Sequence, residues 1–250
     1  MRSYLNLVRR VFQIHKNYYG FKNGPLNVFI LSKISYFLIP FFIYARCSPN
    51  FITLINFILS IVSIVIIFFF HKIFFISIII YLFYAIFDFV DGGIARYYSK
   101  STFFGKFIDG LSDIFYKVFF IFGLSFYSYY HYSDNNLLFF GLFSSILTCF
   151  DTFIYDRYSA ITRWMNKDLK KNVKPYLKKK NYLHLKVFNF YSDIIFFLII
   201  LLLFTYNNHY LKNNLILIFL FVMLSALHNI IFHLFYSYKN LNNYSKPNNK

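Results

Sequence analysis

The sequence predicts an all-α, polytopic membrane protein with six transmembrane helices and an N-terminal interfacial amphipathic helix. The composition, the length of the apolar runs and the placement of basic residues support this fold class. Hydrophobic residues make up 58% of the 250 residues and charged residues only 14%, whereas a soluble domain has about 25% charged residues. The 38 Phe and 24 Tyr outnumber all charged side chains. This composition argues against a water-soluble monomer and against a disordered chain.

Six apolar runs are each close to the ~20 residues that a helix needs to cross a bilayer. An isolated segment in lipid must satisfy its own backbone hydrogen bonds, so we expect each run to be a helix. The six runs are Phe51–Phe70, Ile73–Ile94, Gly105–Tyr127, Leu137–Tyr155, Val187–Tyr206 and Leu215–Tyr236.

A seventh apolar run, Val28–Tyr44, carries Lys33, Ser32, Ser35 and Pro40. These residues favour an amphipathic helix lying in the membrane interface, and a further span is the alternative. We therefore divide the chain into a cytoplasmic leader with this helix (residues 1–46), a six-helix membrane domain (residues 47–239) and a disordered tail (residues 240–250).

Lys and Arg are unevenly distributed among the connections. If both termini lie on one side of six spans, that side receives 23 of the 26 basic residues, and Lys72 and Lys212 lie opposite. Lys117 lies within the third span. Because basic residues collect in cytoplasmic loops, the sequence predicts that both termini are cytoplasmic. A seventh span would place the basic leader on the wrong side.

The excess of basic over acidic residues also predicts what the protein surface binds. The net charge is +17, and all nine acidic residues are Asp. In a membrane protein, such a charge favours anionic lipid headgroups over nucleic acid. The stretch Lys170–Lys180 is the clearest candidate for this lipid contact.

Four Asp residues form a regular pattern in the second and third runs. Asp88 and Asp91 are three residues apart, and Asp109 and Asp113 are four apart, so each pair shares one face of its helix. A short connection makes these helices antiparallel neighbours, so the pairs face each other at similar depth. Four negative charges there require cations. Oxygen-only ligands select Mg²⁺, Mn²⁺ or Ca²⁺, and two divalent ions are the usual clamp for displacement at phosphorus.

The residues after Asp91 fit a phosphate-bearing ligand. Gly92 leaves room for such a ligand to reach the metal ions. Arg96 follows one turn later and is suited to bind a phosphate oxygen.

The same residues resemble the signature of the CDP-alcohol phosphatidyltransferase family. That signature is DxxDGxxAR, eight residues, then GxxxDxxxD, and all its fixed positions match. The matching sequence is Asp88-Phe-Val-Asp91-Gly92-Gly-Ile-Ala95-Arg96, eight residues, and Gly105-Lys-Phe-Ile-Asp109-Gly-Leu-Ser-Asp113. Upstream, a segment resembles the TPNxxT start of the first span, with Ser replacing the first Thr: Ser48-Pro49-Asn50-Phe-Ile-Thr53.

The resemblance implies a membrane transferase of phospholipid biosynthesis that moves a phosphatidyl or similar group from a CDP-linked donor to a hydroxyl and releases CMP. Asp88, Asp91 and Asp109 would hold two Mg²⁺ ions, for which Mn²⁺ could substitute. Asp113 would be the catalytic base and would also touch the second metal ion. A homodimer is common among such enzymes. The residues expected to contact the CDP part of the donor, or to lie near it, are Gly92, Arg96, Thr102, Asn50 and Thr53.

Three readings of the function stay open at this stage. We favour CDP-diacylglycerol as the donor, with a small alcohol, polyol or polyol phosphate as the acceptor. The first alternative has a CDP-linked polar alcohol as donor and a lipid as acceptor. The second alternative is a non-enzymatic cation-binding membrane protein, although the broken helices and internal repeats typical of transporters are missing from the sequence.

The remaining polar residues in the apolar runs give weaker signals. Arg157 either binds a phosphate of the acceptor or anchors the helix at the cytoplasmic face. Asp151 pairs with a base or lines the acceptor pocket. We expect Asp193 to pair with Lys186 or an interior Arg, with the acceptor pocket as the alternative. His228 and His233 are expected to be polar packing residues.

The basic asymmetry gives a prediction about topology. In a chain without its native cysteines, Ser133→Cys should react with an impermeant thiol reagent from outside the cell, whereas Lys174→Cys should react only after permeabilisation. The reverse labelling would overturn the predicted orientation.

Overall fold

The computed structural model describes residues 6–13, 25–99, 102–167, 182–205 and 210–245, and these contain helices and no strands. A short helix covers residues 6–13. The longer helices, with one 3₁₀ turn, are α2 (Leu26–Tyr44), α3 (Pro49–Phe69), η1 (His71–Ile73), α4 (Phe74–Tyr98), α5 (Phe103–Tyr132), α6 (Asn135–Lys167), α7 (Tyr182–Thr205) and α8 (Tyr210–Ser245). The all-α prediction is therefore confirmed.

Every predicted apolar run corresponds to one helix, and most helices extend beyond the run. The clearest extension is α8, which continues to Ser245, so the predicted disordered tail is wrong for residues 240–245. Asn240 donates a hydrogen bond to the hydroxyl of Tyr158 on α6, at 3.0 Å, and this contact holds the last turns of α8 against the fold. The basic stretch Lys170–Lys180 lies outside the described residues.

Six helices of the described chain are long and apolar enough to cross a membrane, as predicted, but they are not the same six. Leu26–Tyr44 is among them. The helix α5 is not, because charged side chains and many Ser and Tyr interrupt its apolar sequence.

The orientation of α2 differs from the amphipathic helix that we expected. Its outward side is apolar, with Phe37 exposed over 74% of its surface, and Lys33 is the charged residue on this side. Ser32 and Ser35 are buried instead. Burial of these serines is tolerated because their hydroxyls donate to the carbonyls of Phe29 and Ser32, within the same helix. An outward apolar face of this kind suits contact with lipid.

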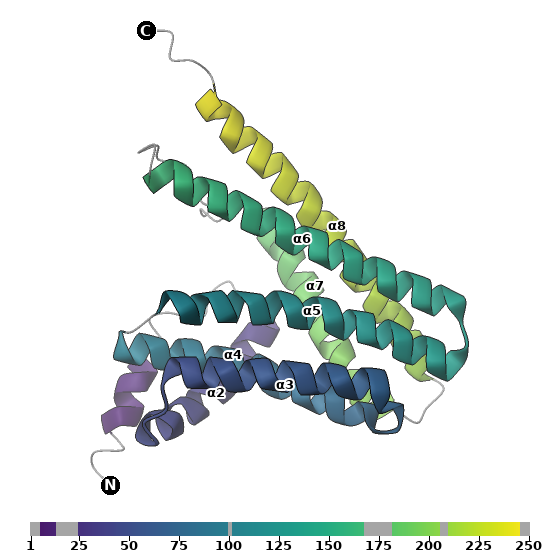
Figure 1. Cartoon of the computed structure of the whole chain (residues 1–250), viewed down its shortest axis with the longest axis horizontal. Helices are drawn as coiled ribbons and strands as arrows, with labels where there is room; N and C mark the ends of the chain where they lie inside the picture. The colour runs from purple at the N-terminus through teal and green to yellow at the C-terminus, as the bar shows by residue number, and fades with distance from the viewer. Residues whose placement is uncertain (1–5, 14–24, 100–101, 168–181, 206–209, 246–250) are drawn as a thin grey trace.

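The helices form a bundle, and their turns and termini lie toward two ends of it (Figure 1). The turn from α4 to α5, the last turns of α6 and the C-terminal end of α8 lie toward one end, and the turns from α3 to α4 and from α5 to α6 lie at the other. The helix α3 packs against both α4 and α5, and α6 packs against α5 and α8. The helices α4, α6 and α8 therefore end toward the same end of the bundle, and the side of the membrane on which this end lies stays a prediction.

Small polar side chains join the helices inside the bundle. Ser63 of α3 lies 3.0 Å from the hydroxyl of Ser77 on α4. Ser144 of α6 donates to the carbonyl of Phe219 on α8 at 2.9 Å. Such interhelical hydrogen bonds are typical of membrane bundles, where the hydrophobic effect between helices is weak.

Asp193 of α7 caps the N-terminus of α2, which corrects our expectation that it pairs with Lys186. Its Oδ2 accepts the backbone N–H of Leu26 at 3.0 Å, and its Oδ1 accepts that of Asn27 at 2.7 Å. The N-cap residue of α2, Pro25, makes no side-chain cap of its own. The first N–H groups of a helix need acceptors and attract negative charge. A carboxylate from another helix meets this need here.

Removing this cap should destabilise the fold. We expect Asp193→Ala to lower the free energy of unfolding by about 1–2 kcal/mol, because two backbone N–H groups lose a charged acceptor. Thermal unfolding in detergent measures the change. The exposed Asp156 supplies the control, Asp156→Ala, and equal unfolding of both variants would contradict the capping role.

Candidate functional site

Three of the predicted metal ligands converge between α4 and α5. One carboxylate oxygen from each of Asp88, Asp91 and Asp109 lies within 4.8 Å of the others. The three-residue spacing on α4 places Asp88 and Asp91 on one face, and the turn into α5 brings Asp109 opposite them. We call these three residues the carboxylate triad. Its compact set of oxygen ligands fits a hard divalent cation.

The triad is held in position from α3. Thr53 donates a hydrogen bond to Oδ2 of Asp91 at 2.7 Å, and both side chains are buried, with Asp91 only 6% exposed. A hydrogen bond of this kind fixes the direction in which a ligating carboxylate points. Thr53 therefore acts on the triad, close to where the sequence placed it.

Asp113 stands outside the triad, one turn further along α5. Its Oδ1 accepts a hydrogen bond from the hydroxyl of Tyr84 on α4 at 2.9 Å. Its Oδ2 lies 3.5 Å from Nζ of Lys117. The hydroxyl of Tyr84 also lies 3.0 Å from Ser112. The two helices thus meet here through long side chains, while each packs its backbone against α3.

The starts of α3 and α5 meet beside the triad. Ser48 caps α3, and Thr102 caps α5 by accepting the N–H of Gly105 at 2.9 Å. Thr102 also donates to Oδ1 of Asn50 at 3.1 Å. A Cβ on Gly105 would lie 2.6 Å from that same oxygen. Gly105 is therefore needed because Asn50 and Thr102, two expected substrate contacts, approach the helix too closely for a side chain.

The end of α4 carries the other expected contacts with the donor. A Cβ on Gly92 would lie 3.1 Å from Nη1 of Arg96, so the glycine lets the guanidinium lie along its own helix toward the triad side. The helix ends at Ser99, which has a left-handed φ of 52°. Gly93 is also tightly packed, because a Cβ there would meet Ile39 of α2.

Two cavities meet at Asp113. The first, of about 420 Å³, lies between α5, α6, α7 and α8 and has several polar residues in its wall. The second, of about 430 Å³, also reaches α2 and α4, including Asp88, and has more aliphatic side chains in its wall. We call them the polar cavity and the apolar cavity. The residues that line both are Asp113, Lys117, Asp151, Thr152, Phe188 and Asn229.

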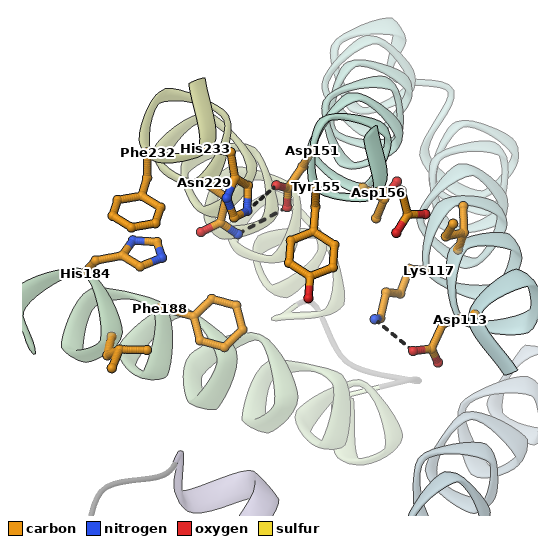
Figure 2. A pocket seen from close by; sticks show the side chains of 14 residues that line it. Asp113, Lys117, Asp151, Tyr155, Asp156, His184, Phe188, Asn229, Phe232 and His233 are labelled. Carbon is orange, nitrogen blue, oxygen red and sulfur yellow. Dashed lines mark hydrogen bonds and ion pairs between the residues drawn. The ribbon is translucent and has the colours of Figure 1, made fainter. Parts of the chain in front are cut away.

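The polar cavity contains side chains that the sequence placed elsewhere (Figure 2). Asp151 accepts a hydrogen bond from Nδ2 of Asn229 at 3.2 Å, and Nε2 of His233 lies 3.4 Å from its Oδ1. Asp151 thus both pairs with a base and lines the cavities. His233, expected to be a packing residue, lines the polar cavity, whereas His228 contacts Nδ1 of His184 at 3.4 Å.

Arg157 lies apart from these residues. It is exposed on α6 and lines neither of the two cavities. Asp193 also lines neither cavity, because its carboxylate caps α2.

Tyr84 and Lys117 were missed as site residues, although their spacing carries a signal. Tyr84 lies four residues before Asp88, and Lys117 lies four residues after Asp113, so each shares a helix face with a motif carboxylate. Asn229 and His233 had no comparable signal, because no motif on α8 points to them.

The contact between Thr53 and Asp91 gives a prediction about metal binding. Thr53→Val keeps the shape of the side chain but removes the donor, so Mn²⁺ affinity should fall about tenfold, as for other residues that orient metal ligands. Thr53→Ser keeps the hydroxyl and should restore most of the affinity. Electron paramagnetic resonance of bound Mn²⁺ in detergent measures both variants. Unchanged affinity in Thr53→Val would show that Thr53 does not orient the ligand.

Comparison with known proteins agrees with this site. The model of one family, described as CDP-alcohol phosphatidyltransferase, matches residues 46–225. No curated protein matches the chain significantly. The matched region begins just before α3, contains the whole carboxylate triad and Asp113, and extends into α8. The chain therefore belongs to the CDP-alcohol phosphatidyltransferase family and is a phosphotransferase that passes a phosphatidyl or related group from a CDP-alcohol to an acceptor in lipid biosynthesis.

Proposed function

We propose that the chain transfers a phosphatidyl group from CDP-diacylglycerol to the hydroxyl of a small alcohol and releases CMP. The observation that carries this proposal is the place of Asp113. It lies one turn from the carboxylate triad and at the junction of the polar and apolar cavities. A donor phosphate beside the triad and an acceptor hydroxyl in the polar cavity would meet at this residue.

The transfer reaction needs a base that accepts the hydroxyl proton and a site that holds the donor phosphate in place. The acceptor oxygen attacks the phosphorus that carries the diacylglycerol, the bond from that phosphorus to the oxygen of CMP breaks, and the hydroxyl proton passes to Asp113. Tyr84 and Lys117 hold the Asp113 carboxylate in place for this transfer. Arg96, Asn50 and Thr102 at the helix ends bind and orient the CDP part.

Asp88, Asp91 and Asp109 would hold the divalent cations, for which we propose two Mg²⁺ ions with Mn²⁺ as a substitute. Asp113 would touch the second ion. Bound there, the ions neutralise the charge of the diphosphate and of the leaving CMP. Thr53 orients one ligand, Asp91, from α3.

The apolar cavity supports a lipid donor. Its walls include Tyr81, Phe120, Ile199 and Val222, and it reaches Asp88 at its polar end. Acyl chains in this cavity would place the attached phosphate near the triad.

We also propose the setting of the enzyme. The triad lies in the second half of α4 and the first turns of α5, next to a basic connection that the sequence predicts to be cytoplasmic, so the active site faces the cytoplasm together with both termini. Basic residues at that end contact anionic lipids. A homodimer, as in the family resemblance, remains a proposal that cross-linking in native membranes tests directly.

Substitutions of the carboxylates separate the proposed roles. Asn in place of Asp88, Asp91 or Asp109 should weaken Mg²⁺ dependence and nucleotide binding together. Asp113→Asn should lower turnover by at least about 10²–10⁴-fold while nucleotide binding partly survives, because it removes the proton acceptor. CMP release from CDP-diacylglycerol in nanodiscs, with CDP-lipid binding measured alongside, tests these variants.

The cap residue provides the control for that series. Asp193→Asn should cost far less turnover than any triad variant, because Asp193 caps α2 and does not itself line either cavity. The proposed mechanism is wrong if Asp113→Asn turns over near the wild-type rate, or if Asp193→Asn is the more damaging change.

A further inference from the structure

The polar cavity has two chemically different walls (Figure 2). Asp113 and Lys117 of α5 form one wall, and Asp151, Asn229 and His233 of α6 and α8 form another. We propose that this cavity binds the acceptor as an uncharged polyhydroxy alcohol, and that Asp151, Asn229 and His233 select it over acceptors that carry phosphate or carboxylate. This inference rests on the proposed function, because it names the acceptor of that reaction.

Asn229 supplies the strongest evidence for a ligand with hydrogen-bond donors. Its side chain is only 7% exposed, and its Nδ2 donates to Asp151. Its Oδ1 is buried and has no hydrogen-bond partner within the described chain. A buried acceptor without a donor is costly, so such groups normally have a partner. A hydroxyl donor would satisfy this oxygen, whereas an ionised phosphate or carboxylate group has no proton to donate.

The charges around the cavity disfavour an anionic acceptor. Among the described residues that line it, Asp113, Asp151 and Asp156 are acidic, His184 and His233 are imidazoles, and Lys117 is the one Lys or Arg and lies 3.5 Å from Asp113. Phosphate sites need Arg or Lys donors. Arg157, which the sequence suggested for that purpose, lies outside the cavity. A phosphorylated acceptor would therefore meet carboxylates.

The distribution of polar groups favours a ligand with several hydroxyls. Carboxylate and amide oxygens lie on opposite walls, and Thr152 and Tyr155 also line the cavity. An amino alcohol with a single hydroxyl would leave more of these groups without a partner. Phe188 and Phe232 give the cavity apolar surfaces on which the carbon skeleton of a polyol can lie. Small-ligand sites commonly combine such surfaces with a few polar groups that fix orientation.

The test uses the full chain in nanodiscs with Mg²⁺, CDP-diacylglycerol and a panel of acceptors. The panel pairs myo-inositol with its 1-phosphate and glycerol with glycerol 3-phosphate, and it adds serine and ethanolamine. CMP release and the mass of the lipid product are the readouts. We expect the uncharged polyols to have kcat/KM at least about tenfold above their phosphates and the amino alcohols, as expected when a site matches substrate hydroxyls. Preference for a phosphate or an amino alcohol would overturn the inference.

Substitutions assign the selectivity to the cavity. Asn229→Ala should raise the KM of the preferred polyol about tenfold, as expected for one lost buried hydrogen bond. Asn214→Ala is the matched control on the same helix, because Asn214 bonds Thr205 and lines neither cavity. The same rise in the control would point to a structural role and overturn the assignment.

A charge series avoids the risk that a buried variant fails to fold. Asp156 is exposed at the cavity, so Asp156→Asn and Asp156→Lys should fold. The ratio of kcat/KM for phosphorylated over uncharged acceptor should rise stepwise along this series. A constant ratio would contradict electrostatic selection in the cavity.

Direct binding separates failure of this inference from failure of the proposed function. Saturable binding of myo-inositol in the absence of nucleotide, lost in Asn229→Ala, supports the polyol site even if CDP-diacylglycerol is not turned over. Absence of CMP release with every acceptor would contradict only the proposed reaction. Absence of polyol binding, with CMP released when another acceptor is present, would contradict only the inference about the polyol.

Discussion

Negative charge inside an apolar helix bundle is costly unless a cation matches it, and this constraint organises the centre of the molecule. Asp88, Asp91 and Asp109 place three carboxylates within a few ångströms of one another. Side chains around them supply donors and positive charge. Thr53 donates a hydrogen bond to Asp91, Tyr84 donates one to Asp113, and Lys117 forms an ion pair with Asp113. Asp88 and Asp113 line the same cavity, from which a ligand can approach them. The helix α3 packs against both α4 and α5.

The cavities extend this arrangement in two directions. Toward α2 and α4 the wall gains aliphatic side chains, and toward the ends of α6 and α8 it gains Asp156 and His233. Asp113 belongs to both linings. A lipid and a water-soluble molecule can therefore approach one carboxylate from different sides, which is the geometric requirement for an enzyme that joins a soluble alcohol to a membrane lipid.

Local spacing predicted the elements and the triad well, because both depend on residues close together in the sequence. The period of a helix places Asp88 beside Asp91, and a short turn brings Asp109 to them. The polar cavity could not be predicted in this way. Asp151 and Asn229 come from different helices, and their contact depends on how α6 and α8 rotate against each other. The partner of Asp193 was missed because it is a pair of backbone N–H groups, which a pattern of side chains does not reveal. The burial of Ser32 and Ser35 was missed because their hydroxyls bond to carbonyls within their own helix.

The cap on α2 also has a consequence for the order in which the protein is made. The helix α2 is synthesised early, but the carboxylate that holds its first turn follows 167 residues after Leu26. Asn27, Val28 and Leu31 of α2 form part of the wall of the apolar cavity. During translation this wall lacks its anchor until α7 has entered the membrane, so the nascent chain passes through a stage in which the cavity is open to the surrounding lipid. Completion of this cavity is thereby coupled to completion of most of the polypeptide.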